Sequence, residues 1–212
     1  AWTHEFTACQ AEVRTLPRNT RAQLLGDLRE HNSVGARAAA SIGCELVRVE
    51  VAPADMPMDH SDDKRYNRLA EIIPPEILLA AFRVAGTHFH FGMSCLEEAV
   101  EVHDALCGHL PKIIAASDHT DGERLRLINQ VVSWAMPEEL VPETGTSPRY
   151  GSVQGWLDYL ELTKTDALRD CWDNVRITDK GTVELRVMGI AQSPEETMSW
   201  VELVFDLLNR RF

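Results

Sequence analysis

The stretch CWDNVRITDKGTVELRVM, residues 171–188, constrains the fold more than any other part of this sequence. In its second half, Val183, Leu185 and Val187 alternate with polar residues, so they share one face of a strand. Its first half is also strand-like, and the linking DKG is a turn sequence, so the stretch predicts a β-hairpin. A hairpin implies an antiparallel sheet, with helices packed on its apolar face and its polar face free to form a site.

The remainder of the chain mixes helical and strand-like patterns without strict alternation, which predicts an α+β fold in a single domain over residues 1–212. The β-prone segments are 5–15, 44–51 and 82–93. Helical patterns cover 18–42, 64–73, 95–110, 122–136, 152–169 and a last helix. Ser193 is the predicted N-cap of the last helix, with Pro194 at its first position. A long loop is expected at 137–151.

Composition excludes several classes of function. The formal net charge of -12 argues against nucleic-acid binding, because phosphate contacts need clustered Lys and Arg. No apolar run approaches the roughly 20 residues that cross a bilayer, so we expect no membrane association. The cysteines form no CxxC pair and their number is odd, which predicts reduced thiols in a cytoplasmic protein. They are Cys9, Cys44, Cys95, Cys107 and Cys171.

The segment GTHFHFG, residues 86–92, places two imidazoles on one face of a strand. His88 and His90 point the same way, and Phe89 points to the opposite, buried face. The flanking glycines leave room for a ligand or another part of the backbone to approach. Two interpretations stay open: ordinary solvent-facing or hydrogen-bonded histidines, or one wall of a metal or nucleotide site.

Glu184 and Arg186 lie on the polar face of the second hairpin strand, and Arg176 lies on the polar face of the first. These groups can form a mutual salt bridge. They can also divide their roles, the carboxylate binding a divalent cation and the guanidinium groups binding phosphate. Two arginines on neighbouring strands favour an anion between them, so we expect phosphate binding.

A further acidic pair lies near the N-terminus. In an ideal strand Glu12 shares a face with Gln10 and Arg14, whereas Glu5 lies on the other face unless a bulge intervenes. Carboxylate oxygens suit Mg²⁺ or Mn²⁺, and one histidine is tolerated beside them. No Ser-His-Asp order, Walker loop or GxGxxG motif competes with this interpretation.

Five segments in this order resemble glutamate–cysteine ligase family 2, the bacterial carboxylate–amine ligases of the glutamine synthetase superfamily. They are HEFTACQAEV, DKRYNRLAEI, GTHFHFG, LPKIIAASDHTDG and CWDNVRITDKGTVELRV. The resemblance extends from about residue 4 to the last helix. It implies a glutamine synthetase-like domain, whose curved, mostly antiparallel sheet holds ATP and two or three Mg²⁺ (or Mn²⁺) ions. Such an enzyme joins an amino-acid-like carboxylate to an amine through an acyl phosphate.

The resemblance also assigns roles to residues at matching motif positions. Glu5, Glu12, His88 and Glu184 match metal ligands, His90 matches a residue near the nucleotide, and Arg176 and Arg186 match catalytic residues that contact the transferred phosphate. This arrangement catalyses by positioning and electrostatic stabilisation.

The sequence departs from the family in containing no GxExE strand, whose two glutamates complete both metal sites. The domain is therefore expected to be short at its N-terminus. Either a second chain or self-association supplies the strand, or the site is incomplete. A non-catalytic relative that binds nucleotide, amino acid or protein is thus the main alternative. A metal-dependent hydrolase using the two histidines, as in amidohydrolases, is a weaker one, because the chain is short for that barrel.

Overall fold

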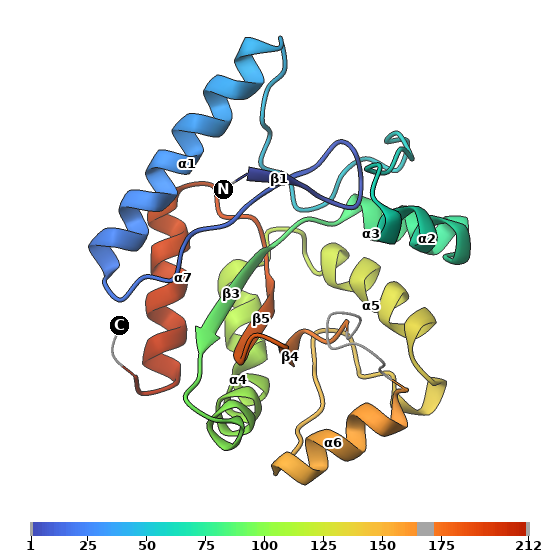
Figure 1. The fold of residues 1–212 in the computed structure, drawn as a ribbon, viewed down its shortest axis with the longest axis vertical. Coiled ribbons are helices and arrows are strands. Elements are labelled where there is room, and N and C mark those ends of the chain that lie inside the picture. Colours follow the sequence, from blue (N-terminus) through green and yellow to red (C-terminus); the bar gives the residue numbers. More distant parts are fainter. Residues whose placement is uncertain (1, 165–171, 211–212) are drawn as a thin grey trace.

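The structure is a computed structural model that describes residues 2–164 and 172–210. Figure 1 shows the arrangement of its helices and strands. In chain order these are β1 (Trp2–His4), β2 (Ala11–Val13), α1 (Arg21–Ser41), α2 (Lys64–Ile72), α3 (Pro75–Arg83), β3 (Thr87–Gly92), α4 (Leu96–Ser117), α5 (Glu123–Ala135), the 3-10 turn η1 (Glu138–Leu140), α6 (Val153–Leu162), β4 (Val175–Ile177), β5 (Thr182–Met188) and α7 (Pro194–Leu207).

The described strands form two open antiparallel sheets, so the α+β prediction is confirmed. One sheet pairs β1 with β2, and the other has the order β3-β5-β4. The predicted hairpin is present as β4 and β5. Its turn ends at Gly181, whose φ of +71° is the left-handed conformation that a hairpin loop of this kind requires.

A β-bulge interrupts the pairing of β3 with β5. Thr87 pairs with Met188, but Phe89 pairs with Leu185, so Arg186 and Val187 both lie opposite the single residue His88. The bulge brings two consecutive residues to the buried side, which explains why Val187 and Met188 are only 1% and 0% exposed.

The main hydrophobic core lies between the apolar face of the three-stranded sheet and α4, with α6 and α7 packed beside them. Figure 1 shows α4 crossing behind β3 and β5, so the opposite, polar face is not covered by that helix. Phe89, Val183 and Leu185 bury the predicted apolar face. The sheet therefore packs its apolar face on α4 and carries its polar side chains on the face away from that helix.

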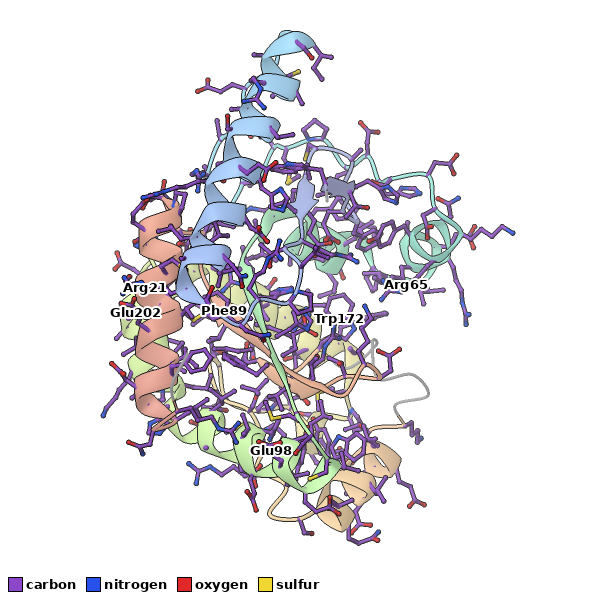
Figure 2. All side chains as sticks on the ribbon, turned by 60° about the vertical axis from the view of Figure 1, so that its left-hand side comes forward. Arg21, Arg65, Phe89, Glu98, Trp172 and Glu202 are labelled. Carbon is purple, nitrogen blue, oxygen red and sulfur yellow. The ribbon has the colours of Figure 1, made fainter. Side chains whose placement is uncertain are left out.

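Helix ends follow the predicted signals at several positions. Ser193 accepts a hydrogen bond from the backbone N–H of Glu196 at 3.0 Å, and Pro194 occupies the first turn of α7. α1 and α7 lie side by side (Figure 2), where Arg21 and Glu202 approach to 2.6 Å. This ion pair is exposed, so it contributes little stability.

The predicted strand over 82–93 is wrong at its beginning, because α3 extends to Arg83. Pro74 and Pro75 end one helix and begin another, a position where proline is favourable. Leu78 and Phe82 then lie on one helical face and pack with Phe6 in a second hydrophobic cluster. Burial in this cluster decides the conformation at Phe82.

The predicted strand at 44–51 is also wrong, because only Val51 forms a bridge, to Val84. Alternating apolar residues form a strand only where a partner strand is available. In the described part of the chain, Val47 and Val49 are instead 68% and 47% exposed, whereas Glu50 is 5% exposed. Glu50 is buried because it accepts hydrogen bonds from Ile190 N–H and from His119.

Other boundaries differ less from prediction. α4 continues through Pro111 to Ser117, since Leu110 and Ile113 on either side of the proline are fully buried. The predicted helix over 152–169 is observed as α6, and residues 165–169 lie outside the described part. The described cysteines, Cys9, Cys44, Cys95 and Cys107, are free thiols, and Cys171 lies outside that part. No helix in the described ranges has the length and apolar character to cross a bilayer.

Candidate functional site: a buried carboxylate between two arginines

Glu184 is the centre of a polar cluster on the free face of the three-stranded sheet. It is only 2% exposed. Its Oε2 accepts from Arg176 Nε at 2.7 Å, and its Oε1 accepts from Arg186 Nη1 at 2.7 Å. His88 Nδ1 lies 3.2 Å from Oε1, and His90 Nε2 lies 3.9 Å from it. Both carboxylate oxygens are therefore engaged by cationic or polar groups of the same chain.

Strand pairing explains why these side chains meet. Glu184 is the direct partner of His90 on one neighbouring strand and of Arg176 on the other. Directly paired residues point to the same side of an antiparallel sheet, so the three side chains form a row across it. The bulge then places Arg186 opposite His88, beside that row.

Electrostatics fix the protonation states at neutral pH. Burial opposes ionisation of Glu184, but His88 and the two guanidinium groups outweigh it and hold the carboxyl pKa far below its usual range. Burial, reinforced by Arg186, lowers the pKa of His88 to about 4 against the attraction of Glu184. Burial also lowers the pKa of His90. At pH 7 the carboxylate is charged and both imidazoles are neutral.

Arg124 adds a cation next to this cluster. The residue is 3% exposed, and burial lowers its pKa to about 10, so it remains charged at pH 7. It influences His88 electrostatically, which places it close to the polar face. Among the described residues, Arg176 and Arg186 both contact the single carboxylate of Glu184, while Glu50 and Asp118 offset part of the charge of Arg124. The two contacting guanidinium groups favour an anion at this point.

The sequence analysis did not single out Arg124, although its position in the helical pattern indicates a buried residue. Arg124, Leu127 and Val131 fall on one helical stripe, at the spacing expected of buried residues, and all three are buried. A charged residue on a buried stripe needs a specific partner. The sequence alone does not reveal which partner that is.

Glu5 and Glu12 lie in a different part of the molecule, at the two-stranded sheet. Glu12 forms an ion pair with Arg14 at 2.7 Å, and Glu5 accepts from Tyr66 Oη at 3.3 Å. Both glutamates raise the pKa of Arg14, Glu12 through its hydrogen bond and Glu5 through charge alone. They are therefore neighbours. Thr3 pairs with Glu12, and β1 ends at His4, so Glu5 lies just beyond the strand and the alternation of an ideal strand does not fix its side.

The expected metal ligands do not come together as one donor set. Across residues 2–164 and 172–210, no three imidazole, thiol or carboxylate side chains gather as a cation site. The oxygens of Glu184 face guanidinium groups, and a metal ion would have to displace them. In this arrangement the described residues form no donor set for a resident Mg²⁺. The metal assignments of Glu5, Glu12, His88 and Glu184 are not tested by it and stay predictions.

The expected long loop borders the site and is held in place by hydrogen bonds. Ser147 Oγ accepts from Val175 N–H at 3.1 Å, next to Arg176 in β4. Asp104 of α4 accepts from the N–H groups of Tyr150 and Gly151 at 2.9 and 2.7 Å. Residues 146–151 thus form a fixed strap beside β4. A role for this loop in substrate choice stays a prediction.

Comparison with known proteins gives one consistent result. A model of the family described as glutamate-cysteine ligase family 2 matches residues 1–210. A protein of Rubrobacter xylanophilus named "Putative glutamate--cysteine ligase 2-3" is 30% identical over 211 residues, an alignment that covers 94% of this chain and 56% of the relative. A "Putative glutamate--cysteine ligase 2-2" of Mycobacterium sp. (strain KMS) is 27% identical, with the same coverage of both chains. A "Putative glutamate--cysteine ligase 2" of Paracoccus denitrificans is 27% identical and covered over 54% of its length.

The chain therefore spans about half the length of the curated relatives it matches. No solved structure matches it.

Proposed function

Because the chain belongs to glutamate–cysteine ligase family 2, we propose that it acts as an ATP-dependent carboxylate–amine ligase. Its substrates are an amino-acid-like carboxylate and an amine. The observation that carries the proposal is the convergence of Arg176 and Arg186 on one point of the polar sheet face, where two guanidinium groups meet a single carboxylate among the described residues. Phosphoryl transfer needs such cationic, preorganised donors around the transferred group.

The chemistry follows in two displacements. A carboxylate oxygen of the substrate attacks the γ-phosphorus of ATP, and ADP leaves with the electron pair of the broken P–O bond. The amine nitrogen then attacks the acyl carbon, phosphate leaves, and the amine loses a proton. Arg176 and Arg186 hold the phosphoryl oxygens during both displacements, and neutral His90 lies at the nucleotide side. Mg²⁺ or Mn²⁺, if bound with ATP, would supply charge neutralisation of its phosphates.

The main alternative is a non-catalytic relative that binds a nucleotide, an amino acid or a protein partner. The position of Glu184 supports this alternative, because its carboxylate already lies between the two arginines. An incoming phosphate would have to share or exchange those donors.

We also propose that the site is completed by a second chain or by self-association. β3 ends the order of the described three-stranded sheet, and His88 and His90 lie on this edge strand. An edge strand presents unpaired backbone groups to which another strand can add. Analytical ultracentrifugation of the 212-residue chain tests self-association: an oligomer supports it, and a monomer at all concentrations contradicts it.

Turnover distinguishes the ligase from its alternative. The chain is incubated with MgATP, L-glutamate and a panel of amines that includes L-cysteine, and ADP and amide product are both quantified. The ligase releases ADP and amide in equal amounts, and an Arg176→Met variant removes this activity. Nucleotide binding without ADP release supports the non-catalytic alternative. Amide hydrolysis with Zn²⁺ and no ATP would revive the hydrolase interpretation.

A further inference from the structure

The β-bulge opposite His88 is stabilised by a side chain from outside the sheet. Arg124, in the first turn of α5, donates from Nη1 to the carbonyl of Val187 at 2.9 Å and from Nη2 to the carbonyl of Arg186 at 3.2 Å. Arg186 and Val187 are the two residues that share His88 as their partner on β3. A bulge disrupts the hydrogen-bonding ladder locally, so its backbone groups benefit from a donor elsewhere.

The same guanidinium also reaches the strand on the other side of the bulge. Arg124 Nε donates to the carbonyl of Ala85 at 2.6 Å, two residues before β3 begins. One planar group therefore connects the start of β3 to the bulge of β5. Only arginine offers several donors in a rigid fork that can satisfy three carbonyls at once.

Gly86 provides the space for this contact. A Cβ at this position would collide with Nη2 of Arg124 and would lie 2.8 Å from the carbonyl of Met188. The first glycine of GTHFHFG thus accommodates a buried side chain of the protein itself. The second, Gly92, has nothing within 4 Å of its would-be Cβ.

Burying an arginine without a carboxylate partner is costly. In the described ranges, the hydrogen bonds of Arg124 go only to backbone carbonyls. Glu50 and Asp118 act on its charge from a distance, and neither carboxylate forms a hydrogen bond with it there. A hydrophobic residue would fill the same helical stripe at lower cost. We therefore expect the contact to hold the strands of the sheet in their observed pairing.

We propose that Arg124 is a positioning residue: by fixing the bulge of β5 against the start of β3, it directs Arg186 toward Glu184 and the anion site. The expected effect on phosphate binding rests on the proposed function. Its structural part, the fixed pairing at the bulge, is independent of that function.

The test compares Arg124→Lys with Arg126→Gln. Lysine keeps the charge but cannot reach three carbonyls in one plane, whereas Arg126 is an exposed arginine two residues further along the same helix. Two quantities are measured on each folded protein: affinity for MgATP and for inorganic triphosphate by calorimetry, and hydrogen exchange of the Thr87 amide. That amide donates to the carbonyl of Gly189 at 3.0 Å, next to the bulge.

We expect Arg124→Lys to bind both probes about tenfold more weakly than the parent, with faster exchange at Thr87, because small misplacements of a binding group cost affinity steeply. Arg126→Gln should match the parent in both measurements. Equal affinity in Arg124→Lys and the parent, or unchanged exchange at Thr87, would overturn the inference.

Two further outcomes of the test, no binding by the parent and a variant that does not fold, also lead to a decision. If the parent binds neither probe, the proposed function fails, and exchange at Thr87 alone decides whether Arg124 fixes the bulge. If Arg124→Lys does not fold, Gly86→Ala replaces it, since the added methyl displaces the guanidinium without removing it. Gly86→Ala is then expected to show the same two changes, and parent-like values would contradict the inference.

Discussion

At the scale of single residues, the contacts of Glu184 decide between the two interpretations of the polar face. Two arginines on neighbouring strands predict an anion between them, and in the structure that anion is the carboxylate of Glu184. The sequence left two interpretations open: a mutual salt bridge, or a site in which the carboxylate binds a cation and the arginines bind phosphate. The observed ion pairs favour the salt bridge as the resting state, while the two guanidinium groups that share one carboxylate in the described structure keep phosphate binding feasible.

Replacing Glu184 with glutamine should destabilise the protein strongly. The change removes the charge that compensates Arg176 and Arg186, and breaking a buried pair in this way costs about 3–5 kcal/mol of unfolding free energy. Urea unfolding measures the loss. Glu139→Gln, at an exposed position, serves as the control and should stay within about 0.5 kcal/mol of the parent. If Glu184→Gln is as stable as the parent, the carboxylate is retained for binding rather than for stability.

His103 predicts that the protein loses stability on mild acidification. The side chain is fully buried and stacked on Tyr150, and burial lowers its pKa in spite of the neighbouring Asp104. Below the ordinary pKa of 6.5 the unfolded chain takes up a proton that the folded protein does not, so unfolding becomes easier as pH falls. The urea midpoint should therefore drop between pH 7 and pH 5. His103→Gln should show a smaller drop, and an equal drop in both proteins would contradict this assignment.

At the scale of helices and strands, the bulge between β3 and β5 connects local structure to the site. Gly86→Ala should lower the free energy of unfolding by about 1–3 kcal/mol, because the added methyl overpacks against Arg124. Gly92→Ala is the matched control, on the same segment and with open space around it. The two changes are compared by thermal and urea unfolding. Equal effects would mean that the contact with Arg124 does not constrain Gly86.

Sequence patterns predicted those elements whose signals are local. The hairpin of β4 and β5 follows from alternation and a turn glycine, and α7 begins at Ser193 as its capping residues predict. The row of Arg176, Glu184 and His90 also follows from alternation once the pairing is known. Local rules therefore placed these three residues on one shared face of the sheet.

The remainder depends on contacts that the sequence does not encode locally. Residues 44–51 alternate like a strand, yet in the described structure Glu50 is buried by hydrogen bonds and its apolar neighbours are exposed. Phe82 belongs to a helix because Phe6 and Leu78 bury it there. Arg124 reaches the sheet from another element, and strand patterns carry no information about it. Tertiary partners overrode local preference at each of these positions.

At the scale of the whole molecule, charge is distributed unevenly. The chain carries a formal net charge of -12, while in the described structure two guanidinium groups contact the carboxylate of Glu184. An acidic surface repels anions in general, so a polyanion such as ATP is expected to bind where the local field is positive and the face is free of packed helices. The polar face of β3, β5 and β4 meets both conditions.

The central claim is that this face binds the phosphates of ATP, and calorimetric titration with MgATP tests it most directly. The parent chain should bind, Arg176→Met should bind at least about tenfold more weakly because a charge-assisted contact is lost, and Arg126→Gln should bind like the parent. Circular dichroism establishes that all three proteins are folded. Absence of binding by the parent even at about 1 mM nucleotide, or equal binding by Arg176→Met and the parent, would contradict the account.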